Sequence, residues 1–85
     1  MSNLVLSRKA GESVKIGETG LFQVLEVHPA KVYVALDNAR VMLRIGNSVV
    51  GELVKVTLST INKGQCKLVF EAERSVAIVR SELLR

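Results

Sequence analysis

The chain of 85 residues is poor in aromatic residues, cysteine, histidine and proline. It has two Phe, one Tyr and no Trp, so its core must be aliphatic and few rings remain to stack on nucleic-acid bases. A lone cysteine, Cys66, cannot form an internal disulfide and is typical of a buried residue in a reducing compartment. The only histidine, His28, has no cysteine or second histidine near it in the sequence, which argues against a metal site.

Long apolar runs and catalytic patterns are also missing. No stretch approaches the roughly 20 apolar residues of a membrane-spanning helix, and the N-terminus has no apolar signal segment. No nucleophile–base set can be built from the sequence, and the turn GETG, residues 17–20, lacks the phosphate-loop pattern. We therefore expect a cytoplasmic protein that is not an enzyme and has no cofactor, no metal and no membrane partner.

The charge is moderately basic and evenly spread. Twelve Lys and Arg against eight Asp and Glu give a net charge of +4. Residues 1–45 and residues 46–85 each carry six basic and four acidic residues. The balance is compatible with a polyanionic partner, but a basic patch would have to be assembled by the fold.

The apolar pattern has period two over most of the chain, which predicts half-buried strands. We expect strands at 4–8, 13–16, 21–27, 31–36, 40–45, 53–61, 66–71 and 76–80, with a short apolar piece at 49–50. The turns between them contain Gly, Asn, Asp or the single Pro29, except for the turn at residues 72–75, which is AERS. This predicts one all-β domain, a small barrel or sandwich of antiparallel strands. Ser81 could cap a short C-terminal helical turn.

A weak internal repeat accompanies this pattern. The run FQVLEVHPAKVYVALD, residues 22–37, parallels VTLSTINKGQCKLVFE, residues 56–71, without a gap. After a two-residue gap, Arg44 falls opposite Arg80. Identity is very low, and any two β-meanders share such alternation, so duplication and simple alternation both remain open.

Two blocks of the chain resemble the CsrA/RsmA carbon storage regulator family of small bacterial RNA-binding proteins. NLVLSRKAGESVKIGE, residues 3–18, resembles the first hairpin of the family. VKVTLSTINKGQCKLVFEAERSVAIVRSEL, residues 54–83, resembles its third to fifth strands and the start of its helix. Strands inserted or duplicated at about 19–53 separate the blocks. The resemblance thus implies a single CsrA-like RNA-binding domain over residues 1–85.

Family members are homodimers with intertwined strands, and each RNA site combines the first strand of one subunit with the fifth strand and helix start of the other. With one first strand, two sets of the third to fifth strands and one helix start, this chain resembles a fused pseudo-dimer. That topology would set residues 4–8 beside residues 76–80 and give one RNA site per chain. The family reads GGA-containing single-stranded loops, in which base edges are exposed.

The resemblance also implies which residues contact RNA. Main-chain and side-chain contacts are expected from Leu6, Ser7 and Arg8, and Arg80 matches the most important RNA-binding arginine of the family. Ile78 and Leu83 would form an apolar floor, and Lys9 and Arg74 would meet phosphates. Without the resemblance, the charged residues are ordinary solvated side chains and the apolar ones ordinary core residues.

The chain departs from the family in three places. Ala72-Glu73 replaces the usual Ala-Pro of the loop, Val79 replaces a histidine, and Val69 replaces a glycine. Glu73 should weaken RNA binding by repelling phosphates. We therefore retain an alternative: a protein-interaction module or antagonist that pairs with an ordinary CsrA-type protein or another partner through edge strands. A homodimer also remains open, and DNA is not an expected ligand. Arg44, as the repeat partner of Arg80, could mark a second site, but a vestige is favoured because no second SRKAGE strand lies beside it.

Overall fold

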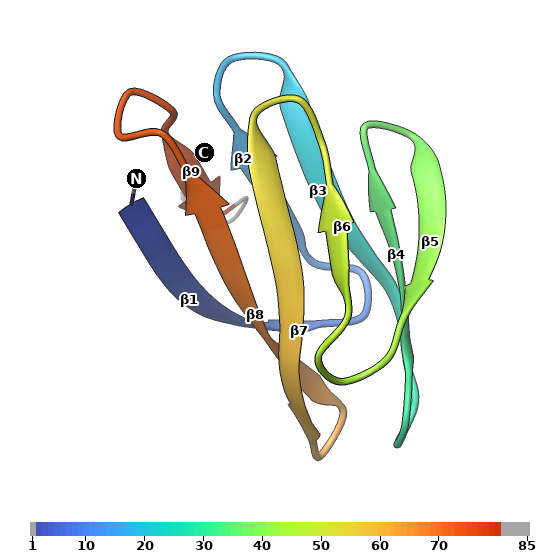
Figure 1. Ribbon diagram of the computed structural model, residues 1–85. Helices are drawn as coiled ribbons and strands as arrows, with labels where there is room; N and C mark the ends of the chain where they lie inside the picture. Colours follow the sequence, from blue (N-terminus) through green and yellow to red (C-terminus); the bar gives the residue numbers. More distant parts are fainter. Residues whose placement is uncertain (1, 81–85) are drawn as a thin grey trace.

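The computed structural model describes residues 2–80, and these residues form nine antiparallel strands without a helix (Figure 1). The strands are β1 (Ser2–Lys9), β2 (Ser13–Ile16), β3 (Gly20–Val27), β4 (Val32–Leu36), β5 (Ala39–Leu43), β6 (Ser48–Val50), β7 (Val54–Asn62), β8 (Gln65–Ala72) and β9 (Ile78–Arg80). The predicted all-β fold is confirmed. The expected helical turn from Ser81 lies outside the described residues. No helix within residues 2–80 is long and apolar enough to cross a membrane.

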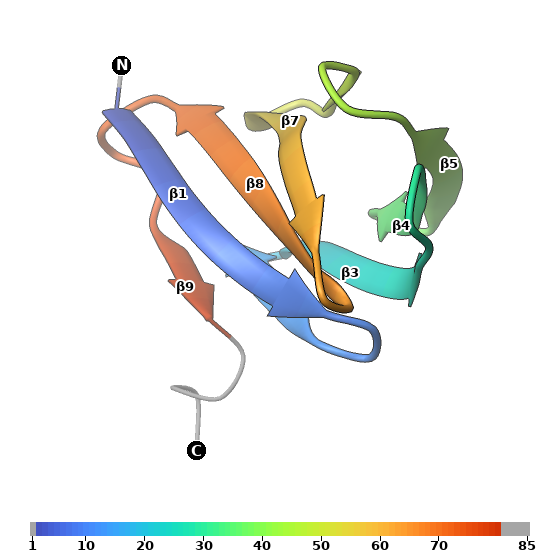
Figure 2. The same ribbon diagram turned by 90° about the horizontal axis from the view of Figure 1, so that it is seen from below.

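The strands form two sheets that pack face to face as a sandwich (Figures 1 and 2). One sheet has the order β1-β8-β7-β6 and the other the order β5-β4-β3-β2-β9. The connection from β1 to β2 crosses from the first sheet to the second. Within the described residues, four strands consequently lie at sheet edges: β1, β6, β5 and β9.

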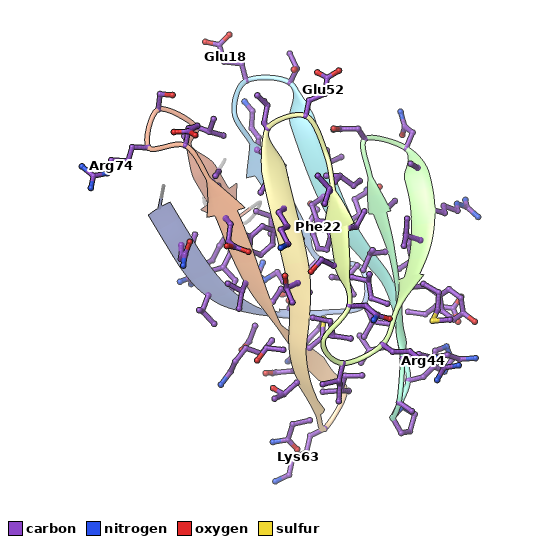
Figure 3. The ribbon with its side chains drawn as sticks, in the orientation of Figure 1. Glu18, Phe22, Arg44, Glu52, Lys63 and Arg74 are labelled. Carbon is purple, nitrogen blue, oxygen red and sulfur yellow. The ribbon has the colours of Figure 1, made fainter. Side chains whose placement is uncertain are left out.

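The core lies between the sheets and follows the period-two pattern. In β4, Val32, Val34 and Leu36 point inward, and in β7 Val54, Val56 and Leu58 do so, as predicted. Phe22 of β3 and Phe70 of β8 meet edge to face across the two sheets, with ring centroids 5.3 Å apart and an interplanar angle of 86°. Figure 3 shows Phe22 between the sheets. Burial of such side chains contributes about 1.5–3 kcal/mol each.

The hairpins β3–β4 and β7–β8 have the same register. Adding 34 to each residue number of the first hairpin gives its counterpart in the second, so the pair Phe22–Leu36 corresponds to Val56–Phe70. Each hairpin also has an irregularity at the same point, at Leu25 in β3 and at Ser59 in β7. A bulge inserts one residue and displaces the register, so an equivalent position is more specific than shared alternation. The gap-free alignment of these two runs therefore describes real structural counterparts.

The turns that precede these hairpins are also counterparts. Gly11 and Gly46 have φ angles of +90° and +91°, and their N–H groups donate to the carbonyls of Val24 and Leu58 at 2.8 Å in both cases. The Glu12 side chain accepts a hydrogen bond from Lys9 N at 2.7 Å, and the Asn47 side chain accepts one from Arg44 N at 3.1 Å. The repeat thus reaches further toward the N-terminus than the two aligned runs.

This geometry corrects the predicted equivalence of Arg44 and Arg80. β5 pairs with β4 in the way that β1 pairs with β8, whereas β9 pairs with β2. β5 is therefore a second first strand, and Arg44 corresponds to Lys9. KAGESV, residues 9–14, and RIGNSV, residues 44–49, carry the sequence signal. The prediction missed it because β1 and β5 share almost no side chains before the turn.

The predicted neighbourhood of residues 4–8 and 76–80 also needs correction. These segments do not pair with each other, because β1 pairs with β8 in one sheet and β9 pairs with β2 in the other. β9 is also shorter than expected and begins at Ile78 instead of Val76. The two strands are edges of different sheets on one flank of the sandwich (Figure 2).

Candidate nucleic-acid interface

The flank formed by the edges of β1 and β9 brings together two segments in which the sequence predicts RNA contacts. β2 connects them, because it follows β1 through the turn at residues 10–12 and pairs with β9 along its outer side. Arg80 is the register partner of Val14, near the beginning of β2. Arg80 therefore lies on the neighbouring strand close to the turn that follows Lys9.

Among the described strands β1 pairs only with β8, so no described strand covers the main-chain groups of its outer edge, where the Ser7 carbonyl accepts a hydrogen bond from the Arg8 side chain. Leu58 N donates to Asn47 O on the β6 side, and residues of an antiparallel sheet alternate in the side to which they bond. Leu58 is the register partner of Leu68 in β8, and Leu68 is the register partner of Leu6 in β1. By this alternation the main-chain N–H and C=O groups of Leu6 point toward β8, and those of Val5 and Ser7 point toward the open edge. An open edge of this kind can pair with an external acceptor or donor.

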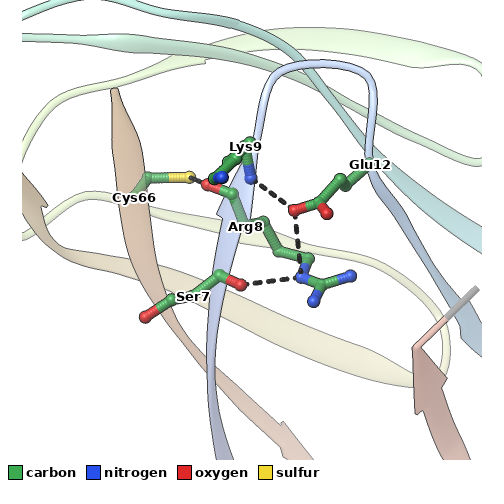
Figure 4. Close-up of polar contacts among 5 residues, drawn as sticks. All are labelled: Ser7, Arg8, Lys9, Glu12 and Cys66. Atoms are coloured by element: carbon green, nitrogen blue, oxygen red, sulfur yellow. Dashed lines mark hydrogen bonds and ion pairs between the residues drawn. The ribbon is translucent and has the colours of Figure 1, made fainter. Parts of the chain in front are cut away.

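Arg8 is the one buried charged residue in the described part of the chain, with 6% of its surface exposed. Its Nε donates to the Ser7 carbonyl oxygen at 2.8 Å and lies 3.8 Å from Glu12 Oε1 (Figure 4). The same Glu12 oxygen accepts the Lys9 N–H. A buried guanidinium is stable only when it is paired and hydrogen-bonded. Arg8 thus ties the end of β1 to the turn and holds this part of the edge in place.

The remaining predicted site residues fall into two groups. Lys9, Arg74 and Arg80 are exposed, and Figure 3 shows Arg74 pointing outward from the loop between β8 and β9, on the side opposite Arg44. Leu6 lies in the core with 4% of its surface exposed, and Ile78 is half-buried against the core. Leu83 lies outside the described residues. The structure therefore brings Ser7, the basic residues and Ile78 to one flank but withdraws the Leu6 side chain.

Two residues at this flank were missed by sequence reasoning. Val5 is 53% exposed on the open edge of β1, and Lys67 of β8 is the exposed register partner of Ser7. Ser7 and Lys67 line a shallow hollow of about 140 Å³ with Thr60, Asn62 and Gln65. The alternation of Lys67 with Cys66 and Leu68 was visible in the sequence, but its pairing with Ser7 depends on a long-range register.

Cys66 is buried beside Arg8 and does not form a reactive site. Its Sγ donates to the Arg8 carbonyl oxygen at 3.5 Å. Burial raises the pKa of the Cys66 thiol from 9.0 to about 11, because the thiolate would lose its hydration. Within residues 2–80, no group of three or more His, Cys, Asp or Glu side chains could hold a metal ion.

Comparison of the chain with models of known protein families, with curated proteins and with solved structures finds no match.

Proposed function

We propose that this protein is a CsrA-like RNA-binding translational regulator that recognises GGA-containing single-stranded loops of mRNA leaders or small regulatory RNAs. It would act without catalysis, by occupying the RNA and excluding the ribosome. The proposal rests on the resemblance of residues 3–18 and 54–83 to the CsrA/RsmA family. According to this proposal, RNA binds to the flank formed by β1 and β9.

One observation carries this proposal more than any other. The first family-like block, residues 3–18, and the end of the second, residues 76–83, are far apart in the sequence, yet β1 and β9 are sheet edges on the same flank. The family site also combines a first strand with a fifth strand. Arg80 is exposed at the end of β9, as a residue that contacts a ligand must be.

The chemistry of this flank suits a guanine-containing loop. Guanine presents two acceptors on one edge, N7 and O6, which main-chain N–H groups or a guanidinium can meet. The outward N–H groups of Val5 and Ser7 and the side chain of Arg80 are the donors that we assign to this role. Lys9, Lys67 and Arg74 would meet phosphates, while Arg8 would keep the edge in position.

Arg80→Ala tests the proposal, with Arg40→Ala as a matched control. Arg40 is also exposed, but it lies on β5, the opposite edge of the same sheet. Fluorescence anisotropy would measure binding to a short hairpin with GGA in its loop and to a hairpin with a scrambled loop. We expect loop-dependent binding that Arg80→Ala weakens by about 1–3 kcal/mol, with little change in Arg40→Ala. Equal binding to both hairpins, or equal loss in both variants, would contradict the proposal.

A further inference from the structure

The edge of β6 is bare where the repeat places a strand. By the equivalence of the two turns, β6 corresponds to β2. β2 is paired on both sides, with β3 and with β9, whereas β6 is paired only with β7 among the described strands. The sheet of β6 therefore has four strands and the other sheet has five.

The main-chain groups of this bare edge can be identified. Gly51 N donates to Val54 O on the β7 side, so by alternation the N–H and C=O groups of Val50 point outward. Lys15, the counterpart of Val50 in β2, is the register partner of Val79 in β9. One further pairing continues the ladder there, because Gly17 N donates to Ala77 O at 2.7 Å.

The side chains of Val49 and Val50 at the unpaired edge of β6 are apolar and only partly buried. Val14 is fully buried in β2, whereas its counterpart Val49 is only half-buried and Val50 is 73% exposed. An open hollow of about 470 Å³ adjoins this edge, lined in part by Leu36, Val49 and Gly51. On the other flank, Val76 and Ile78 pack against the core beside β2.

The edge lacks the charge, proline and bulge that protect many edge strands, and its length of three residues is what limits pairing. Natural edge strands carry charges, proline or bulges that block a further strand. Residues 48–51, SVVG, contain no charge and no proline, and the pairing of β6 with β7 is regular. β1, by contrast, ends in Arg8 and Lys9.

We propose that the β6 edge is a docking site for an extended segment of a partner protein, which adds a fifth strand to the four-stranded sheet. The segment has the alternating apolar pattern of residues 76–80, with two apolar side chains in the places that Val76 and Ile78 occupy beside β2. It is held by main-chain hydrogen bonds at Val50 and by the hollow at Leu36 and Val49. This site is on the flank opposite the proposed RNA site and does not depend on it.

A second copy of this chain suits the edge less well. Within residues 2–80, the strand that carries this pattern and pairs at the corresponding place in the other sheet is β9, which already covers β2 of its own chain. Its donation to β6 of another copy would leave β2 without its outer neighbour. Pairing of β6 with β6 would join only the three residues of each strand.

A synthetic peptide RSVAIVR, with the sequence of residues 74–80, is the probe. In a titration of the ¹⁵N-labelled protein, we expect amide shifts at residues 48–52 and none at residues 14–17. Val50→Pro should weaken binding by about tenfold or more, because it removes one outward N–H without removing a hydrogen bond inside the sheet. Val50→Thr keeps the N–H and should bind within about threefold of the wild type.

A second form of the peptide keeps the test valid if Val50→Pro fails to fold. N-methylation of the valine that corresponds to Val79 removes the peptide's own donor and should also abolish the shifts. Absence of shifts at millimolar peptide would overturn the proposal, as would shifts at residues 14–17 through displacement of β9. Concentration-dependent shifts at residues 48–52 without peptide would make a second copy the occupant and would also overturn it.

Discussion

Substitution of Gly11 or Gly46 by alanine should destabilise the protein by the same amount. The two glycines have φ angles of +90° and +91°, and a Cβ atom added to either would meet no atom within 4 Å. Steric crowding therefore contributes nothing at either position, and only the backbone conformation distinguishes alanine from glycine.

The size of the effect follows from that conformation. An L-residue other than glycine pays about 1–2 kcal/mol in the left-handed region, and strained backbone positions cost about 1–3 kcal/mol. We expect about 2 kcal/mol for Gly11→Ala and for Gly46→Ala. A domain of this size has a total stability of about 4–13 kcal/mol, so both variants should fold. Gly20→Ala is a contrasting variant, because its Cβ would lie 2.6 Å from the Ile16 carbonyl oxygen.

Urea unfolding followed by circular dichroism measures all three variants against the wild type. Equal midpoint shifts for Gly11→Ala and Gly46→Ala, with a larger shift for Gly20→Ala, would support the equivalence of the two turns. A difference of more than about 1 kcal/mol between the first two variants, taken from their midpoint shifts at a common m value, would refute it.

Three other predictions concern the core and the Arg8 cluster. Because the pKa of Cys66 is raised to about 11, the folded state keeps a proton that the unfolded state loses above about pH 9, so stability should fall as pH rises from 9 to 11. Subtraction of the same urea series for Cys66→Ala isolates this effect, which should not exceed about 1.4 kcal/mol per pH unit. A double-mutant cycle of Phe22→Leu and Phe70→Leu should give a coupling of about 0.5–1.5 kcal/mol, whereas additivity would contradict the edge-to-face contact. Glu12→Gln keeps an acceptor for Lys9 N but removes the charge beside the buried Arg8 guanidinium and should cost about 1–3 kcal/mol in thermal or urea unfolding, and Glu12→Ala should cost more.

The positions of the strands could be predicted because they depend on the alternation of apolar and polar residues within each strand. Alternation of apolar and polar residues gave the inward faces of β4 and β7, and Asn62-Lys63-Gly64 marked the β7–β8 hairpin, in which Lys63 and Gly64 have positive φ. The strand at 13–16 has the predicted bounds. Strand ends were less well predicted, since Ala72 continues β8 and Val76 precedes β9.

Pairing between distant strands was not predictable from alternation. Any β-strand with one apolar face can occupy several places in a sandwich, so residues 40–45 were matched with the last strand although β5 takes the place of a first strand. The burial of the Arg8 side chain was not predicted either. Its partner Glu12 is four residues further along the chain, on the other side of the turn, and alternation does not show whether the two side chains meet.

The most direct test of the proposed RNA site is a titration of the ¹⁵N-labelled protein with the GGA hairpin, read at each main-chain amide. The account predicts shifts at Val5, Ser7 and Arg80 that saturate at one RNA per chain, because only one flank has both a first strand and β9. Shifts centred on β5 and β6, or saturation at two RNAs per chain, would contradict it.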